Sequence, residues 1–148
     1  MFNNRKVLVT GGTGLIGMPL VRLLVEAGAR VRVASLDYAC SLALPPSVSF
    51  LGVNLMTWRG CQQAVRGIED VFHLAGVKGS VGIGVSRAAS FMVPALLMNT
   101  HLMEAARVAG VERYLFTSSV AVYPPSEVFK EAAAWSGEPH PTDRYSAY

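Results

Sequence analysis

The residues in this sequence best suited to chemistry are the glycines after its first apolar run, in VTGGTGLIG from Val9 to Gly17. Such a turn can hold a dinucleotide, because glycines let a pyrophosphate approach backbone N–H groups at the start of a helix. Two patterns overlap: G-x-G-x-x-G counted from Gly12, and G-x-x-G-x-x-G counted from Gly11. In the second pattern Gly11 forms the tight turn, Gly14 permits the close approach, and Gly17 permits contact between helix and strand.

Dinucleotide binding requires this turn to lie between a strand and a helix. Residues 6–10 (KVLVT) have the pattern of a buried strand. Apolar residues then recur at helical spacing until Gly28, which is a typical C-terminal stop. The expected inner face of this helix comprises Leu15, Ile16, Leu20, Leu23 and Leu24.

Strands and helices are expected to alternate along the rest of the chain. Further strands are expected at 31–35, 48–53, 70–76 and 113–119, and a long helix at 86–109. A short helix before the fourth strand would bury Trp58, Cys61, Ala64 and Val65. This alternation predicts an α/β doubly wound parallel sheet, the Rossmann fold, with strand order 3-2-1-4-5.

The proline-rich segment 123–148 breaks the alternation. We expect a surface loop there, with a short helix at 127–134. Because no sixth strand is evident in this segment, the sheet is expected to be incomplete at the C-terminus.

The composition is typical of one globular domain. The 148 residues are 51% hydrophobic and 16% charged, and the net charge is +3 with dispersed basic residues. We therefore expect neither nucleic acid nor a membrane as partner. The N-terminus lacks the pattern of a signal peptide, so we expect a cytoplasmic protein. Cys40, Cys61 and the three histidines are dispersed, so neither a disulfide nor a metal site is expected.

The end of the second strand should meet the adenosine ribose of a bound dinucleotide. An acidic side chain there would accept a hydrogen bond from the ribose 2′-hydroxyl, whereas an arginine would favour a 2′-phosphate. Ser35 occupies this place, with Asp37 two residues later and Arg32 nearby. Asp37 favours NAD, and Ser35 with Arg32 leaves NADP open. The alternative is that Asp37 is a solvated loop residue.

Four motifs follow one another along the chain: TGGTGLIG at 10–17, HLAG at 73–76, TSSVAVYP at 117–124, and a tyrosine after a proline-rich loop. Together they resemble the extended short-chain dehydrogenase/reductases, in particular the NAD-dependent epimerase/dehydratase family that acts on nucleotide sugars. HLAGVKGSVG at 73–82 is most similar to the loop of the GDP-L-fucose synthase and GDP-mannose epimerase branch. The resemblance favours the glycine count from Gly11 and leaves Gly12 as a residue that keeps the turn tight.

The resemblance also implies where the cofactor binds. It places residues 74–76 behind the adenine and ribose, and it puts Asn54 where the family usually has an acidic residue. The Asn54 carbonyl oxygen could still accept a hydrogen bond from the adenine amino group. Asn99 lies one turn after the position of the family's helix asparagine and is expected to be a plain helix residue. The expected contacts to NAD or NADP, with NAD favoured, are Gly11, Thr13, Gly14, Leu15, Ile16, Gly17, Ser35, Asp37, Asn54, Leu55, Leu74, Ala75, Gly76 and Lys78.

Two residues are expected to be catalytic by the same resemblance. Ser119, four residues before Tyr123, would hydrogen-bond the substrate oxygen; the alternative is that it caps the exit of a strand. Tyr148 would begin the motif Y-x-x-x-K, in which a lysine lowers the pKa of the phenol for proton exchange, with Tyr145 as the alternative. That lysine would lie beyond residue 148. We therefore expect residues 1–148 to be the N-terminal portion of an NAD(P)-binding domain, with a partial cofactor site, incomplete catalysis and no C-terminal substrate domain.

The expected function is that of an oxidoreductase or isomerase: an NAD(P)-dependent epimerase, dehydratase or reductase of nucleotide sugars. The alternative is a non-catalytic dinucleotide-binding or sensing protein of the atypical short-chain type, which keeps the glycine turn and loses the tyrosine relay. The exposed edge of the strand at 113–119 predicts self-association into homo-oligomers.

Overall fold

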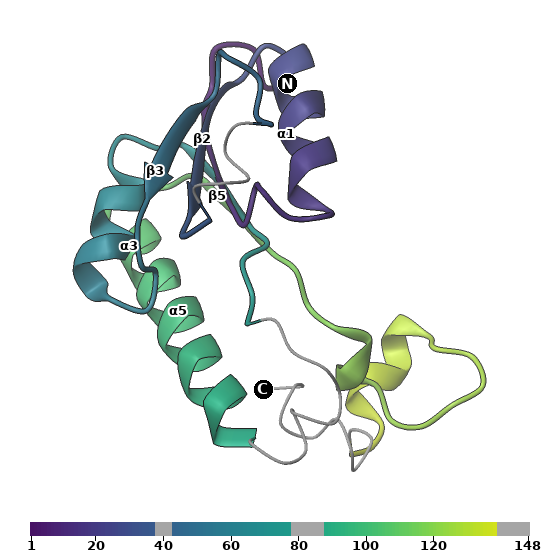
Figure 1. The fold of residues 1–148 in the computed structure, drawn as a ribbon. Helices are drawn as coiled ribbons and strands as arrows, with labels where there is room; N and C mark the ends of the chain where they lie inside the picture. The colour runs from purple at the N-terminus through teal and green to yellow at the C-terminus, as the bar shows by residue number, and fades with distance from the viewer. Residues whose placement is uncertain (38–42, 78–87, 139–148) are drawn as a thin grey trace. The chain divides into compact units, whose positions relative to one another are not determined.

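The computed structural model describes residues 1–37, 43–77 and 88–138 of the chain, shown in Figure 1. The chain divides into two compact units. The first comprises residues 1–76 and 97–117, and the second comprises residues 77–96 and 118–148.

The first unit contains the expected parallel sheet, in the strand order β3-β2-β1-β4-β5. The strands are β1 (Lys6–Thr10), β2 (Arg30–Ser35), β3 (Ser49–Gly52), β4 (Asp70–His73) and β5 (Arg113–Phe116). In this register Thr10 lies between Ala34 of β2 and His73 of β4. The predicted fold class and strand order are therefore confirmed, although β3, β4 and β5 are shorter than expected.

Helices cover both faces of this sheet (Figure 1). Helix α1 (Gly17–Glu26) lies on one face, and α3 (Trp58–Val65) lies on the other with the part of α5 (Ala88–Val108) from residue 97 onward. Alternate β1 side chains enter separate cores. Val7 and Val9 pack with Val21 and Leu24 of α1 and with other apolar residues, whereas Leu8 belongs to the core on the α3 and α5 face. None of the described helices is long and apolar enough to cross a membrane.

Helix α1 begins later than its apolar pattern predicts. A turn bond from the Gly14 N–H to the Gly11 carbonyl precedes it, so Leu15 and Ile16 lie before the first helical residue. Their side chains are 93% and 69% exposed. Leu23 is also exposed, so the expected inner face is partly wrong. The buried residues of α1 are Gly17, Val21 and Leu24.

The second unit contains two short 3-10 helices, of which only the second overlaps the helix predicted at 127–134. They are η1 (Val120–Val122) and η2 (Glu131–Trp135). The Ser126 hydroxyl donates to the Val128 carbonyl at 2.9 Å and accepts from the Val128 N–H at 3.3 Å. This local bonding competes with a helical turn at 127, so helical structure starts only at Glu131.

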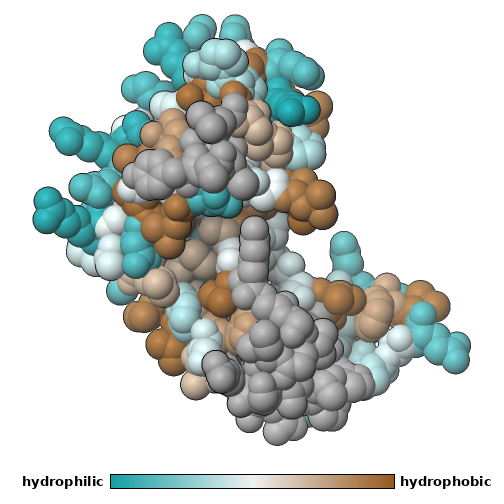
Figure 2. Space-filling view, in the orientation of Figure 1, coloured by the Kyte–Doolittle hydropathy of each residue, from teal (hydrophilic) through white to brown (hydrophobic). Residues whose placement is uncertain are grey.

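A buried ion cluster joins the amino ends of β4 and β5. The Asp70 side chain is 2% exposed and accepts two hydrogen bonds from Arg5 and two from Arg113, at 2.6–2.9 Å. Burial by itself would raise the pKa of the Asp70 carboxyl, but the bonds from Arg113 and Arg5 outweigh it and lower the pKa to about 2. The Arg113 guanidinium also lies 5.2 Å from the centre of the Phe2 ring. Hydrophilic residues gather over this end of the first unit, at the top of Figure 2. The cluster holds the strands together at the edge opposite the glycine turn.

Candidate dinucleotide site

The glycine turn leaves the carboxyl end of β1 and leads into α1. Gly11 has a φ of 66°, and its N–H donates to the Ala34 carbonyl of β2 at 3.1 Å. The Gly14 N–H donates to the Gly11 carbonyl at 2.9 Å, and the Met18 N–H donates to the Gly14 carbonyl at 3.0 Å. The turn is therefore tight and opens directly into a helix N-terminus, where a bound anion is favoured.

The segment between this turn and α1 presents unused donors. Among the described residues, the N–H groups of Leu15 and Ile16 have no hydrogen-bond acceptor. Ile16 is the N-cap residue of α1 and provides no side-chain cap. Two N–H donors beside two exposed apolar side chains fit a ligand that combines a phosphate with an apolar ring.

Gly11 forms the tight turn expected of it, and the surroundings of Gly14 are compatible with its expected role. A Cβ on Gly11 would lie 2.9 Å from the backbone N and Cα of Ala75, so only glycine allows the turn to approach the end of β4. A Cβ on Gly14 would meet only the Gly11 carbonyl oxygen, at 3.2 Å. No other atom lies within 4 Å of this Cβ position, so a ligand could approach the backbone of Gly14 closely.

Gly12 and Gly17 differ from the prediction. A Cβ on Gly12 would lie 2.7 and 2.9 Å from the methyl groups of Val33 on β2. A Cβ on Gly17 would collide with the backbone of the turn itself, at the Gly11 carbonyl oxygen and Gly12 Cα. Gly12 therefore provides the strand contact expected of Gly17. Glycines of both overlapping patterns are thus required by the packing of the turn.

The end of β2 is bonded to the glycine turn through two hydroxyl groups. Thr13 Oγ1 and Ser35 Oγ lie 3.1 Å apart, and Ser35 Oγ accepts the Asp37 N–H at 3.1 Å. The structure thus brings Thr13, Ser35 and Asp37 to one place, with Asp37 exposed. An exposed carboxylate after β2 suits a ribose hydroxyl donor.

Arg32 faces away from this place. Its Nη1 donates to the carbonyls of Ala64 at 3.0 Å and Arg66 at 2.9 Å, at the C-terminus of α3. Successive side chains of a strand point to opposite faces of the sheet. Val31 and Val33 enter the core on the α1 face, so the Arg32 side chain lies on the α3 face and reaches that helix. The Arg32 guanidinium therefore lies at the end of α3 and not at the end of β2, where a 2′-phosphate would bind.

Asn54 and Leu55 follow β3. The Asn54 Oδ1 accepts the Met56 N–H at 2.9 Å, which fixes the side chain in a local turn and leaves one lone pair of that oxygen. The Leu55 side chain is only 5% exposed and belongs to the core on the α3 face. Leu55 can therefore contact a ligand only through its backbone.

The exit of β4 bends over the glycine turn through bonds to Thr10. The Leu74 N–H donates to the Thr10 carbonyl at 3.2 Å, and the Ala75 N–H donates to the Thr10 hydroxyl at 3.2 Å. Leu74 and Ala75 are half-buried, and Gly76 is exposed with open space where a Cβ would be. The structure therefore places Leu74 and Ala75 beside Gly11, as a site at the carboxyl edge of the sheet needs.

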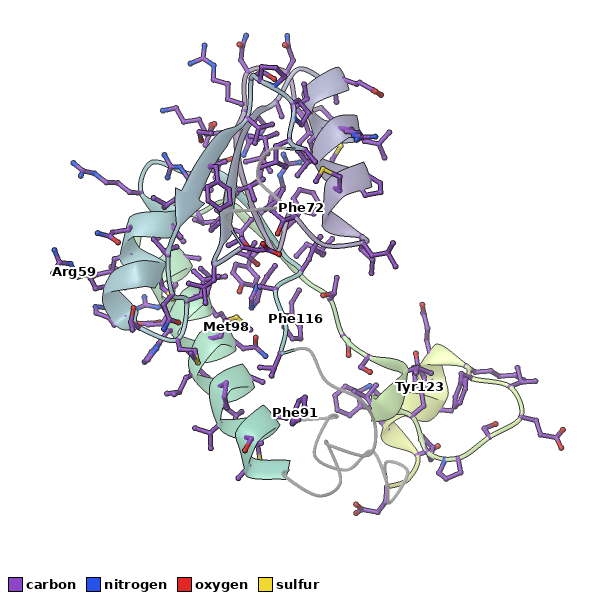
Figure 3. All side chains as sticks on the ribbon, in the orientation of Figure 1. Arg59, Phe72, Phe91, Met98, Phe116 and Tyr123 are labelled. Carbon is purple, nitrogen blue, oxygen red and sulfur yellow. The ribbon has the colours of Figure 1, made fainter. Side chains whose placement is uncertain are left out.

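The buried His73 and the partly buried Asn99 form a contact that the sequence motifs did not predict. His73 is fully buried; its Nδ1 lies 2.6 Å from Thr10 Oγ1, and its Nε2 lies 2.9 Å from Asn99 Oδ1. Burial lowers the pKa of His73, which the bond to Asn99 only partly opposes. Phe116, labelled in Figure 3, packs 5.6 Å from the imidazole centre. The expectation that Asn99 is a plain helix residue was therefore wrong. The signal was its spacing, because Asn99 shares a helical face with the buried Leu102 and Ala106.

The remaining predicted site residues belong to the second unit or lie outside the described residues. Lys78 and Tyr148 lie outside the described residues. Ser119 is exposed in the second unit, where its carbonyl accepts the Val122 N–H at 3.2 Å. Among the described residues no group of three or more His, Cys, Asp or Glu side chains could hold a metal ion.

Known proteins resemble this chain in both sequence and fold. A sequence profile of the NAD dependent epimerase/dehydratase family matches residues 7–148. GDP-mannose 3,5-epimerase of Arabidopsis thaliana is 29% identical over 146 residues, which are 92% of this chain and 38% of that protein. The 3 beta-hydroxysteroid dehydrogenase/Delta 5-->4-isomerase of Mycobacterium tuberculosis is 37% identical over 123 residues, which are 79% of this chain and 32% of that protein.

A solved structure shows the same likeness in three dimensions. UDP-glucose 4-epimerase of Thermus thermophilus, in complex with NAD, superposes with a TM-score of 0.81 at 32% identity. The match covers 96% of this chain and 46% of that one. The chain therefore spans less than half the length of each of these proteins. With the family profile matching all but the first six residues, the chain belongs to the NAD-dependent epimerase/dehydratase family.

Proposed function

We propose that residues 1–148 are the N-terminal portion of the NAD-binding domain of an enzyme that epimerises, dehydrates or reduces a nucleotide sugar. The observation that carries the proposal is the turn from Gly11 to Gly17, which combines free N–H donors, a helix N-terminus and open space at Gly14. Membership of the NAD-dependent epimerase/dehydratase family supports it.

The same site favours NAD over NADP. A 2′-phosphate needs a cation at the end of β2, and Arg32, the nearest expected cation, is bonded to the C-terminus of α3. The exposed carboxylate of Asp37 would repel a phosphate and accept a ribose hydroxyl instead. Thr13 and Ser35 would support the ribose from the turn.

The chemistry would fall to Ser119 and Tyr148. Bound NAD would supply the hydride acceptor and donor. The Ser119 hydroxyl would donate a hydrogen bond to the sugar oxygen, and Tyr148 would hold the exchanged proton, its pKa lowered by a lysine four residues later. Without such a lysine a phenol titrates near its ordinary pKa of about 10, and proton exchange at neutral pH is poor.

Self-association through the edge of the sheet is part of the proposal. Within the described sheet β5 pairs with β4 alone, and Leu115 and Phe116 on β5 are 47% and 45% exposed. An unpaired strand edge with apolar side chains favours pairing with a second chain. Phe116→Lys should shift the chain toward monomer in light scattering. A wild-type monomer at high concentration would contradict this part of the proposal.

Cofactor binding can be tested on this chain by calorimetric titration with NAD⁺ and NADP⁺. Gly14→Ala places a methyl group on the open side of the turn, so NAD⁺ affinity should fall at least about tenfold while the fold persists. Gly137→Ala is the matched control, because its Cβ would meet only Pro124, at 3.4 Å. Undetectable NAD⁺ binding by the wild type, or equal affinity in Gly14→Ala, would refute the proposal.

The enzyme and the non-catalytic binder differ in the residues beyond Tyr148. A lysine at the fourth position after Tyr148 in the gene, with NADH-linked turnover in a chain extended through that region, would support the enzyme. Tight NAD⁺ binding without turnover would support the binder. GDP-mannose, UDP-glucose and a 3β-hydroxysteroid are the substrates to compare, because the chain resembles enzymes named for each class. Activity on the steroid alone would refute the nucleotide-sugar proposal.

A further inference from the structure

A chain of hydrogen bonds links helix α5 to the dinucleotide site. It runs from Asn99 to His73 at 2.9 Å, from His73 to the Thr10 hydroxyl at 2.6 Å, and from that hydroxyl to the Ala75 N–H at 3.2 Å. Thr10 and His73 are fully buried, so water cannot replace the bond between them, and the other two bonds are partly buried. The chain therefore begins on a helix and ends at the backbone that lies against Gly11.

Only one arrangement of protons satisfies every group in this chain. If Asn99 presents its carbonyl oxygen, His73 carries its proton on Nε2 and donates to that oxygen. The Nδ1 atom is then an acceptor for the Thr10 O–H, and the Thr10 oxygen keeps a lone pair for the Ala75 N–H. With Asn99 turned over, His73 would donate from Nδ1 to Thr10. The Thr10 proton would then be buried without an acceptor among the described residues, which is costly.

The last bond in the chain determines the shape of the turn. Ala75 lies so close to Gly11 that even a methyl group on the glycine would be 2.9 Å from its backbone. A displaced Ala75 would therefore press on the tight turn that begins the dinucleotide site. Neighbouring aromatic rings hold the imidazole laterally, with Phe116 and Tyr114 centred 5.6 and 6.2 Å away. Asn99 is the group that selects which nitrogen of His73 carries the proton.

We propose that Asn99 is a positioning residue for the dinucleotide: it holds His73 in the Nε2–H tautomer, so that Thr10 fixes the Ala75 backbone against the glycine turn. This inference rests on the proposed function, since it concerns the same cofactor site. In this proposal Asn99 acts through His73 and Thr10 rather than by contact with the ligand.

The test combines the tautomer of His73 with NAD⁺ affinity. Long-range ¹H–¹⁵N spectra of the ¹⁵N-histidine chain at pH 8 report the tautomer, and His101→Gln and His140→Gln variants assign the signals. We expect the Nε2–H form in the wild type. Asn99→Leu removes the acceptor, so the tautomers should mix and NAD⁺ should bind about tenfold more weakly, the scale of one lost hydrogen bond. Asn99→Asp keeps an acceptor oxygen and should restore both the Nε2–H tautomer of His73 and the affinity for NAD⁺.

Controls separate this inference from general loss of structure. Gln63→Leu removes an exposed amide from α3, where it has no described hydrogen bond, and should change neither readout. If Asn99→Leu does not fold, Asn99→Ser, whose hydroxyl is too short to reach the imidazole, should show the same mixing and weaker binding. An Nδ1–H wild type, or Asn99 variants that bind NAD⁺ like the wild type, would overturn the inference alone. A wild type that does not bind NAD⁺ would overturn the proposed function and the inference with it.

Discussion

Replacing Asp70 by asparagine should destabilise the sheet from the edge opposite the glycine turn. Arg5 and Arg113 each donate two hydrogen bonds to this carboxylate, which is 2% exposed. Its pKa falls from 3.8 to about 2 in the folded chain. Because a tenfold change in an ionisation constant corresponds to about 1.4 kcal/mol, the ionised form contributes about 2 kcal/mol to the free energy of unfolding. Asp70→Asn should lose at least this amount, because it also leaves two guanidinium groups without their shared carboxylate.

The acid dependence gives this prediction a second readout. A carboxyl whose folded pKa is below its unfolded pKa stabilises the chain fully above the unfolded value and loses that effect as the pH falls toward the folded value. The contribution of Asp70 is therefore present above about pH 4 and declines toward pH 2. Between pH 7 and pH 3 the stability difference between wild type and Asp70→Asn should narrow by about 1 kcal/mol.

Urea unfolding followed by circular dichroism at pH 7 and pH 3 measures both effects. Glu104→Gln is the matched control, because Glu104 pairs with Arg107 at 2.8 Å on an exposed helix surface. Exposed pairs contribute little, so the control should change the free energy of unfolding by less than about 0.5 kcal/mol. Equal losses in the two variants at pH 7, or a stability difference for Asp70→Asn that does not change with pH, would refute the reasoning.

Three further substitutions test other parts of the fold by the same unfolding measurement. Gly17→Ala drives a methyl group into the Gly11 carbonyl and should cost about 2 kcal/mol or more; a neutral result would show that the turn can relax. Tyr114→Phe removes a buried hydroxyl that has no partner among the described residues, so stability should stay equal or rise by up to about 1 kcal/mol, and a clear loss would reveal a hidden partner. Thr57→Ala removes the acceptor of the Gly60 N–H at the start of α3 and should cost about 1 kcal/mol, and no loss would mean that the cap is dispensable.

The fold could be predicted because its signals are local. Short apolar runs that stop at glycine predict strands, and their alternation with helical spacing predicts the strand order. The strand ends could not be predicted in the same way. The apolar pattern extends the fourth strand to residue 76, but the strand ends at His73, because the Ala75 N–H bonds to a side chain of β1 instead of continuing the ladder. That bond joins residues 65 positions apart.

The glycine turn likewise has features that the sequence predicts and features that only the structure shows. Its strand–turn–helix context and the open space at Gly14 follow from the pattern itself. The neighbours of the other glycines do not, since Gly12 is required by the Val33 side chain and Gly17 by the turn's own backbone. Arg32 could also be interpreted only with the structure, because it lies near the end of β2 in the sequence and yet binds the end of α3.

Asn99 shows why a family position and a physical role must be separated. The family motif gives Asn99 no role, because the helix asparagine of the family belongs one turn earlier. Accounting for buried polar groups leads to the opposite conclusion. His73 is fully buried, its two ring nitrogens need one donor and one acceptor, and Thr10 can serve only one of them. A second polar group must therefore meet the other nitrogen, and in this chain Asn99 of α5 provides it. The requirement for a second polar partner arises from the burial of His73 and not from the position of Asn99 in a family motif.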